Sequence, residues 1–375
     1  MNSSLPSLLA DAPGTGACLA VDVSGRVDTT VVGHRQAFDH AGPLASPLPM
    51  TADTWHDLGS VTKIVGTTAA LLALVDEGAV DPAEPASRYS SRLVDAPLTD
   101  LLQHRAGLWE WWPTYVSARD AGGALDVVAG LPLRYPPGRG RHYSDLGFMT
   151  LGRVVEVAAG RPLADAVASQ VSGPLGLGVR YAAPPAVAAV AAGAPGDVVE
   201  RDMLDTGRPY PVGIRSSEFT GWRTRVRIGE VDDGNAYHAF GGVAGHAGLF
   251  GRARDLLAFG RHVLDSLRGD GPWRTPTIRR FLEVGPDAGQ ALGFRAWPLA
   301  GCATPAYGHT GFPGVAFAVL PAHDAVVALL TNRLHTHAPP PPAPFEPHWL
   351  RVLDAVHRSI TSDPGAARRC GSPAH

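Results

Sequence analysis

The sequence almost lacks lysine. Lys63 is the only one among 375 residues, so arginine supplies 31 of the 32 basic side chains. A coding bias toward arginine explains the general pattern, and a lysine that survives it marks a position where arginine does not serve. Arginine stays protonated in proteins, whereas a buried lysine can lose its proton. Lys63 is therefore singled out before any motif is considered.

Cysteine and charge are also scarce, and each shortage excludes a class of protein. The three cysteines, Cys18, Cys302 and Cys370, are odd in number and widely spaced, which predicts neither a disulfide framework nor a cysteine metal motif. Charged residues make up only 18% of the chain, and the formal net charge is −3. This composition argues against charge-driven disorder and against a nucleic-acid or membrane partner.

The sequence shows neither a secretory signal nor an obvious membrane span. No basic residue precedes Arg26, and the first apolar stretch ends at Asp11, which is unlike a signal peptide. No uncharged run approaches the ~20 apolar residues of a membrane helix. The charge-free stretch 182–196 is mostly Ala and Pro, as in a surface connection. We therefore expect a cytoplasmic protein.

Strand-like sequence lies at both ends of the chain, and helical sequence lies between. Residues 18–23 and 26–32 flank Ser24-Gly25 and predict a hairpin, and two apolar runs near the C-terminus predict another. A long apolar helix is expected from Ser60 to Glu77, closed by Gly78. The remaining expected elements are the strands 314–320 and 325–331, the helices 98–104, 146–159, 163–171 and 348–360, and a rigid proline segment at 338–344.

This order predicts an α/β fold of the α+β type, with one antiparallel sheet built from both chain ends and flanked by helices. The length suits two domains, or one large domain with an insertion. We expect a mostly helical insertion and a ligand-binding cleft at its junction with the sheet. The expected boundaries are 1–81 and 235–362 for the two parts of the sheet domain, 82–234 for the insertion and 363–375 for a disordered tail.

Ser60 and Lys63 lie three residues apart at the start of the long helix, so their side chains share one helical face. The apolar residues that follow predict a desolvated ammonium with a lowered pKa. A neutral lysine beside a serine is a nucleophile with its base. In the alternative interpretation, Ser60 is only a helix N-cap and Lys63 extends to solvent.

Two later segments favour the catalytic interpretation. Tyr143-Ser144-Asp145 opens a helix, and His309-Thr310-Gly311 precedes the C-terminal hairpin. In order and spacing, Ser60 to Lys63 and these two segments resemble the S-x-x-K, Y-x-N and K-T-G motifs of the penicillin-recognising serine enzymes, namely class C β-lactamases, low-molecular-weight penicillin-binding proteins and family VIII esterases. Segments 98–108, 242–250 and 329–333 are similar to that family as well, and the resemblance covers residues 17–360.

The resemblance implies a β-lactamase-like fold and a role for each matching residue. Ser60 would be the acylated nucleophile, Lys63 would take its proton, and Tyr143 would relay it to the leaving group. The backbone N–H groups of Ser60 and Phe312 would form the oxyanion hole. His309 and Thr310 would bind the acyl substrate beside Gly311. Asp145 would either cap its helix or contact substrate.

Two departures from the family pattern bear on the substrate. His309 stands where many relatives have lysine, and Asp145 stands where many have asparagine. Both changes weaken the positive charge that holds a β-lactam carboxylate, so we expect weak or no β-lactamase activity. An arginine is expected to replace the lost charge, with Arg141, Arg223 and Arg225 as candidates.

Two further groups of residues give weaker indications of function. His335-Thr336-His337 has metal-like spacing, but a solvated loop is the better interpretation, and neither a metal nor a cofactor is expected. Trp109, Trp111 and Trp112 either line the cleft or form a packed loop.

The sequence thus predicts a serine acyl-enzyme hydrolase of esterase or D-peptidase type, acting on a small ester, amide or peptide. The alternative is an intracellular transacylase that passes the acyl group to an amine or alcohol in specialised-metabolite biosynthesis. A third hypothesis is a non-catalytic sensor of β-lactams or peptides. A sensor does not need an efficient proton relay, so the full set of Ser60, Lys63 and Tyr143 argues against it.

Overall fold

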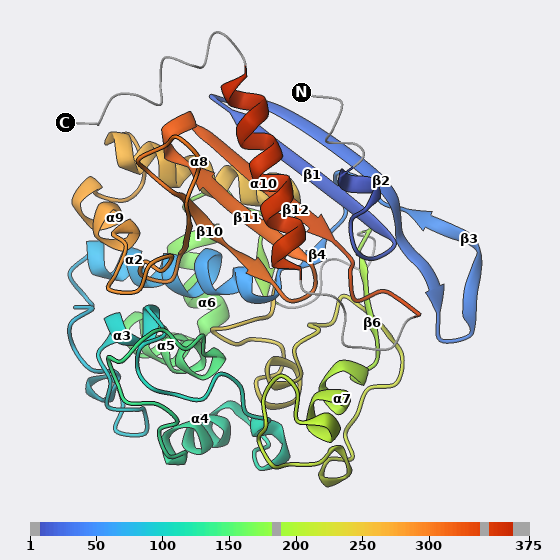
Figure 1. The fold of residues 1–375 in the computed structure, drawn as a ribbon. Coiled ribbons are helices and arrows are strands. Elements are labelled where there is room, and N and C mark those ends of the chain that lie inside the picture. Colours follow the sequence, from blue (N-terminus) through green and yellow to red (C-terminus); the bar gives the residue numbers. More distant parts are fainter. Residues whose placement is uncertain (1–7, 182–188, 338–344, 363–375) are drawn as a thin grey trace.

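A computed structural model describes residues 8–181, 189–337 and 345–362 of the chain. The tail expected after residue 362, the proline segment 338–344 and part of the stretch 182–196 lie outside these residues. Figure 1 shows the sheet and α10 in the upper part of the molecule and a helical part below.

The regular elements follow the chain order that the sequence predicts, with additional short strands. The strands are β1 (Gly16–Val23), β2 (Arg26–Asp39), β3 (Gly42–Pro49), β4 (His56–Asp57), β5 (Arg180–Tyr181), β6 (Ala192–Pro195), β7 (Val226–Ile228), β8 (Leu249–Gly251), β9 (Arg295–Trp297), β10 (Ala306–Gly311), β11 (Val315–Leu320) and β12 (Ala325–Thr331). The α-helices are α2 (Ala69–Asp76), α3 (Leu98–Leu102), α4 (Ala121–Gly130), α5 (Asp145–Ala159), α6 (Leu163–Val167), α7 (Val198–Thr206), α8 (Ala253–Arg268), α9 (Thr275–Leu282) and α10 (Glu346–Thr361).

The main sheet joins the two ends of the chain, as the sequence predicts. Its order is β3-β2-β1-β12-β11-β10-β9, with antiparallel pairing throughout. The junction is the β1–β12 pair, in which Ala17 lies opposite Thr331. The expected first hairpin is confirmed, and Ser24 and Gly25 both have positive φ, as a two-residue turn requires.

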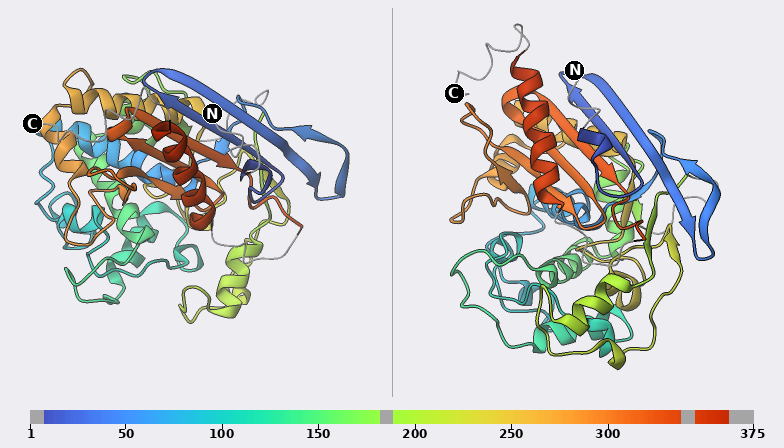
Figure 2. Two further views of the ribbon diagram at one scale, coloured as in Figure 1. Left: turned by 45° about the horizontal axis from the view of Figure 1, so that its top comes forward. Right: turned by 45° about the vertical axis from the view of Figure 1, so that its right-hand side comes forward.

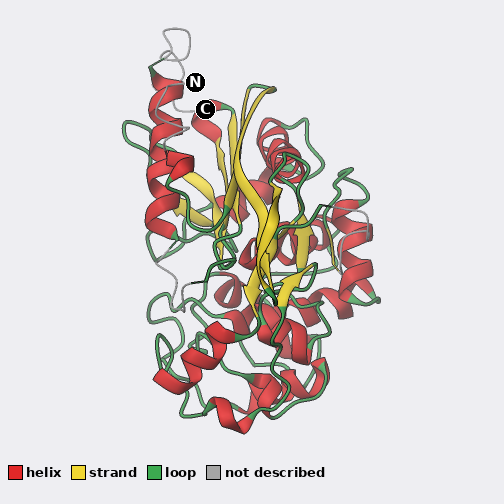
Figure 3. Cartoon of the chain, turned by 90° about the vertical axis from the view of Figure 1, so that its right-hand side faces the viewer, coloured by secondary structure: helices red, strands yellow, loops and turns green. Residues whose placement is uncertain are grey.

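Helices cover both faces of this sheet. In Figure 3 the sheet is seen nearly edge-on, with α10 on one side and further helices on the other. One core holds Trp349 of α10 against the sheet, and a second core packs α8 and the long apolar helix against the opposite face. Residues of β11 and β12 are therefore buried on both faces, which explains why these strands are continuously apolar instead of alternating.

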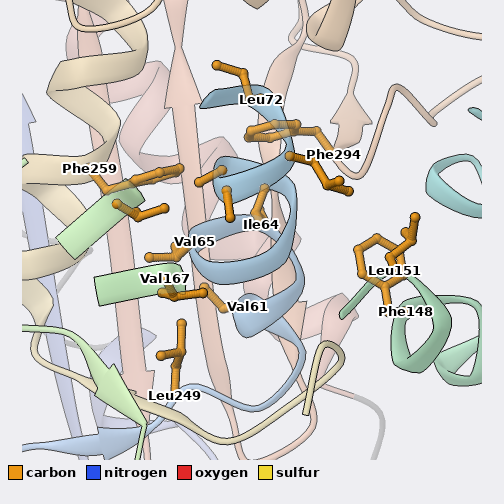
Figure 4. Close-up of a cluster of buried hydrophobic side chains, with 14 of the residues drawn as sticks. Val61, Ile64, Val65, Leu72, Phe148, Leu151, Val167, Leu249, Phe259 and Phe294 are labelled. Atoms are coloured by element: carbon orange, nitrogen blue, oxygen red, sulfur yellow. The ribbon is translucent and has the colours of Figure 1, made fainter. Parts of the chain in front are cut away.

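The long apolar helix is the centre of the larger core. It runs from Gly59 to Asp76 as a 3-10 turn, a π-helical stretch (Lys63–Thr68) and α2, and Gly78 follows with a φ of 75°. In Figure 4 its side chains, among them Ile64, lie between apolar side chains of other elements, such as Phe259 on one side and Phe148 on the other. By length and mean hydropathy this helix could cross a membrane, but 83% of it is buried inside the protein. Burial on this scale is that of a core helix.

The segment between the two parts of the sheet is mostly helical, and it lies below the sheet in both views of Figure 2. It also contains short strands that the sequence does not predict, because β5 pairs with β8 and β6 pairs with β7. These strands are only two to four residues long, too short for a clear alternating pattern. The expected boundaries at 81/82 and 234/235 stay a prediction.

Candidate active site

A cavity of about 430 Å³ collects most of the residues that the motifs single out. Ser60 reaches it from the start of the apolar helix, Tyr143 and Asp145 from the start of α5, and His309 from β10. Lys63 and Gly311 lie just behind its wall. The lining residues used below are Ser60, Trp111, Arg141, Tyr143, Asp145, Tyr210, Arg295, His309, Thr310, Phe312 and Arg333.

A tight backbone turn presents Ser60. Gly59 has a φ of 48°, and a Cβ there would overlap the ring of Pro313. Its N–H donates to the Asp57 carboxylate at 2.9 Å. Ser60 is half-buried, and the fully buried helix that follows fixes its position. The turn therefore holds the hydroxyl at the cavity while the next residues anchor it in the core.

Lys63 is fully buried directly beneath Ser60. Its Nζ donates to Ser60 Oγ at 2.8 Å and to the carbonyl oxygen of His246 at 3.3 Å, and it forms an ion pair with Asp145 Oδ1 at 2.7 Å. The interpretation of a lysine that extends to solvent is therefore wrong. The interpretation of Ser60 as a simple N-cap is also wrong, because no side chain caps the start of this helix.

The expected lowering of the Lys63 pKa is wrong as well. Burial lowers it, but the carboxylate of Asp145 and the phenol of Tyr143 outweigh burial, and the pKa of Lys63 is raised. The sequence reveals the apolar helix around the lysine but not the carboxylate, which comes from 82 residues further along the chain. In the resting state Lys63 is therefore an ammonium.

Tyr143 is the second group that contacts the serine. Its Oη donates to Ser60 Oγ at 2.8 Å. Burial raises the pKa of Tyr143, although the positive charge of Lys63 acts in the opposite direction. The ring of His104 lies 4.6 Å from the tyrosine ring, and His104 Nδ1 accepts the N–H of Ser144 at 3.0 Å. The serine thus lies between an ammonium and a neutral phenol.

Asp145 does not cap its helix, and its expected contact with substrate stays a prediction. Ser144 caps α5, because its Oγ accepts the N–H of Gly147 at 3.2 Å. The carboxylate of Asp145 instead faces the buried ammonium of Lys63, and its side chain remains 17% exposed toward the cavity. Asp145 therefore compensates a buried charge that would otherwise be strongly destabilising.

The strand β10 carries the third motif past the start of the apolar helix. β9 forms the edge of the sheet and pairs only with residues 306–308 of β10. His309, Thr310 and Gly311 extend beyond that pairing. A Cβ on Gly311 would overlap the Leu58 carbonyl and lie 3.5 Å from the Ser60 nitrogen. The two backbone segments with the Ser60 and Phe312 N–H groups therefore lie in contact.

His309 is buried and neutral. Burial, and then the positive charge of Lys63, lower its pKa well below the usual value. Its Nδ1 lies 2.6 Å from the Thr310 carbonyl oxygen, so this nitrogen carries the proton. Nε2 is buried and has no hydrogen-bond partner among the described residues. The cavity therefore gains an unused acceptor here in place of a fixed positive charge.

Positive charge enters the cavity from arginines. Of the three candidates, Arg141 lines the cavity, whereas Arg223 is held by Asp197 at 2.7 Å. Arg225 is not among the cavity residues. Burial, followed by the nearby Arg295, lowers the pKa of Arg141 to about 10, so it remains cationic at neutral pH. The motifs give no signal for Arg295 and Arg333, which also line the cavity.

Aromatic side chains supply one wall. Trp111 lies in this wall and stacks with Tyr210 at 6.5 Å between ring centroids. Trp109 instead packs edge-on against Trp112 at 5.0 Å, outside the cavity lining. Trp111 therefore lines the cleft, whereas Trp109 and Trp112 form a packed loop.

The expectation of a solvated loop at residues 335–337 holds for His337, which is exposed, and is wrong for His335. His335 is fully buried, stacks on Phe38 at 3.8 Å and accepts the N–H of Ala37 at 3.0 Å. His337 packs against the same phenylalanine at 3.8 Å. These rings hold the segment after β12 against β2.

Comparison with known proteins decides the family. The model of the Beta-lactamase family matches residues 11–345. The chain belongs to this family. It is 29% identical to a putative D-alanyl-D-alanine carboxypeptidase of Escherichia coli O157:H7, over 88% of this chain and 82% of the relative. It is 30% identical to an N-acetylmuramyl-L-alanine amidase of Bacillus subtilis, over 86% and 78%.

A solved structure bears out the fold. EstCE1, described as a hydrolase with promiscuous acyltransferase activity, matches with a TM-score of 0.68 and 19% identity, over 94% of this chain and 97% of that one. This similarity extends through the sheet and the helical part together. The predicted fold class and the predicted family are thus confirmed, and the chain is a β-lactamase-related serine hydrolase.

Proposed function

We propose that the protein forms an acyl-enzyme at Ser60 and hydrolyses a small ester or amide, in the manner of an esterase or D-peptidase. One observation carries this proposal: Ser60 Oγ lies 2.8 Å from both Lys63 Nζ and Tyr143 Oη, at the wall of a cavity. A serine between two groups that exchange protons is an activated nucleophile.

The charge of Lys63 determines the order of proton transfers. An ammonium cannot accept the Ser60 proton, so Lys63 first releases a proton and then acts as the base. As Ser60 Oγ attacks the substrate carbonyl, its proton moves to Nζ, and Tyr143 Oη supplies a proton to the leaving group. The N–H groups of Ser60 and Phe312 stabilise the oxyanion. Asp145 acts through Lys63 as a positioning residue.

The cavity favours an ester or amide over a β-lactam. The third motif supplies a neutral imidazole at His309 where a lysine would hold a carboxylate. Arg141, which also lines the cavity, supplies positive charge there instead of the third motif. We propose weak or no β-lactamase activity for this reason.

A transacylase is the second candidate. The aromatic wall formed by Trp111 and Tyr210 favours an organic acceptor over water, because it limits the water near the acyl-enzyme. The acyltransferase activity named for EstCE1 supports the same alternative. In this case an amine or alcohol takes the acyl group from Ser60.

Intact-mass measurement tests the nucleophile. After exposure to p-nitrophenyl esters of several acids, we expect one acyl adduct on the wild-type protein and none on Ser60→Ala. An adduct of equal yield on the variant would refute the assignment. Ser91→Ala is the matched control, because Ser91 is exposed and lies outside the cavity lining.

The partitioning of the acyl-enzyme between water and an added acceptor separates the hydrolase from the transacylase. With an ester donor and a panel of amines and alcohols, the hydrolase gives free acid at a rate independent of the acceptor. The transacylase gives amide or ester product at the expense of acid. Complete failure of every acceptor to compete with water would exclude the second candidate for the compounds tested.

A further inference from the structure

A cluster of three metal-binding side chains lies outside the cavity. Cys302 lies between β9 and β10, His323 lies in the turn between β11 and β12, and His357 lies on α10. Their Sγ and imidazole nitrogen atoms all lie within 4.8 Å of one another, and both histidines are buried. No residue of this cluster lines the cavity at Ser60. The absence of a cysteine motif in the sequence gave no reason to expect it.

The distances fit a small divalent cation with little rearrangement. Cys302 Sγ lies 3.6 Å from His323 Nε2, and that nitrogen lies 2.9 Å from His357 Nδ1. With Zn–S near 2.3 Å and Zn–N of 2.0–2.1 Å, tetrahedral coordination separates S from N by about 3.6 Å and N from N by about 3.3 Å. The distance from Cys302 Sγ to His323 Nε2 already matches, and the two imidazole nitrogens need to separate by about 0.4 Å. The third distance, from Cys302 Sγ to His357 Nδ1, lies within 4.8 Å, and rotation of the cysteine side chain can shorten it.

The hydrogen bonding of His357 aims a lone pair into the cluster. His357 Nε2 lies 2.9 Å from the carbonyl oxygen of Ala300, so Nε2 carries the proton and Nδ1 is the acceptor. Metal-bound histidines usually donate their second N–H to a carbonyl or carboxylate in this way.

We propose that Cys302 Sγ, His323 Nε2 and His357 Nδ1 bind one divalent cation of the zinc class. One thiolate with two imidazoles suits Zn²⁺ and Co²⁺, and it does not suit the oxygen-seeking Mg²⁺ or Ca²⁺. Binding breaks the Cys302 S–H bond and releases that one proton to solvent. The proton between the imidazoles stays on His323 and moves from Nε2 to Nδ1, which frees the Nε2 lone pair for the cation. A water molecule completes the coordination, since three protein ligands leave one position open.

The consequence is structural. The cation would join three segments that are distant in the sequence: the loop before β10, the turn between β11 and β12, and the final helix. Because the unfolded chain does not preserve this arrangement, binding free energy adds to folding free energy. The site tethers α10 to the sheet and takes no part in the chemistry at Ser60.

Cobalt substitution tests the site directly. Untagged full-length protein is stripped with a chelator and titrated with Co²⁺ and then with Zn²⁺. We expect one equivalent of Co²⁺, a near-ultraviolet charge-transfer band from the thiolate, intense visible bands of tetrahedral cobalt, and displacement by Zn²⁺. Mg²⁺ at the same concentration should produce no change. Zn²⁺ should also raise the melting temperature of the stripped protein.

Two variants on different elements locate the ligands. Cys302→Ser should abolish the charge-transfer band, and His357→Asn should weaken Co²⁺ binding at least tenfold. Cys18→Ser, which removes a buried thiol of β1, should bind like the wild type. Either ligand variant suffices if the other does not fold. Failure of the stripped wild type to bind one equivalent, or equal binding by both ligand variants, would show a hydrogen-bonded histidine pair only and overturn the proposal.

Discussion

At the scale of single residues, the solitary lysine is explained by three contacts. Its ammonium contacts the serine, a backbone carbonyl and a carboxylate, all from within the core. An arginine retains the charge and satisfies Asp145, but its fork of donors cannot release a proton to act as a base. The rarity of lysine in the sequence and the geometry around Ser60 therefore have one chemical reason.

Lys63→Arg separates charge from basicity. We expect acylation by a p-nitrophenyl ester to fall by about 10²–10⁴-fold, the usual contribution of a general base. The ion pair with Asp145 should keep the variant folded, which a melting curve checks. Stopped-flow measurement of the acylation burst gives the rate, and a wild-type burst would mean that Lys63 is not the base.

Asp145→Asn changes the pH dependence in a defined direction. Asp145 is a main cause of the raised Lys63 pKa, so its loss lets burial lower that pKa. Only neutral lysine accepts the Ser60 proton, so the acylation rate of the wild type should rise with pH through the Lys63 pKa. In the variant this rise should move to lower pH. A kcat/KM profile that does not move, or moves to higher pH, would contradict the assignment.

The same substitution should destabilise the fold at neutral pH. A group whose pKa is raised in the folded state stabilises below its unfolded pKa, and this stabilisation is lost as pH rises through the folded value. Removing one partner of such a buried pair costs about 3–5 kcal/mol. Urea unfolding should therefore show a deficit for the variant at pH 7 that shrinks in alkaline solution. Asp145→Glu, which keeps the charge, should show a smaller deficit.

At the scale of elements, the site depends on the close approach of β10 to the start of the apolar helix. The approach is possible because Gly311 has no side chain where it meets the Leu58 carbonyl. Any Cβ there pushes the strand away from Ser60. The third motif thus ends in glycine for a packing reason that applies to the site as a whole.

Gly311→Ala should therefore lower the acylation rate strongly and the melting temperature only modestly. We expect the Phe312 N–H to move from its position, with a loss of about 10²–10³-fold in kcat, the cost of one oxyanion donor. Gly130→Ala is the matched control, because a Cβ at Gly130 meets no atom within 4 Å. Steady-state kinetics and melting curves of both variants make the comparison. Unchanged kcat in Gly311→Ala would show that the approach has no catalytic role.

At the scale of the whole molecule, two cores on opposite faces of the sheet have separate tasks. The larger core surrounds the helix that carries Ser60, and the smaller one fixes α10 to the other face (Figures 3 and 4). Trp349 is completely buried in the smaller core. Damage to that core should therefore lower stability and leave the chemistry of the folded molecules intact.

Trp349→Ala tests this separation. We expect a loss of about 3–5 kcal/mol in the free energy of unfolding, as for other large buried aromatics. Leu350→Ala on the same helix, 40% exposed, should stay within about 0.5 kcal/mol of the wild type. Active-site titration gives kcat per folded molecule. A matching loss of kcat in Trp349→Ala would show that the two cores are coupled.

The order of residues along the chain is enough to identify which side chains could do chemistry and which segments form the sheet. A lone lysine three residues after a serine, two further motifs in the right order, and apolar runs at both chain ends suffice for the fold class, the family and the candidates Ser60, Lys63 and Tyr143. These features are local, because spacing, propensity and motif order are all read along the chain.

How those residues act on one another depends on the packing of the whole chain. Residues 60, 145 and 246 meet around one nitrogen, so the Lys63 pKa rises where the apolar sequence predicted a fall. Likewise, Cys302, His323 and His357 converge from three segments with no motif between them. Electrostatics and metal ligation depend on distance in space, and the sequence fixes that distance only through the complete packing of the chain.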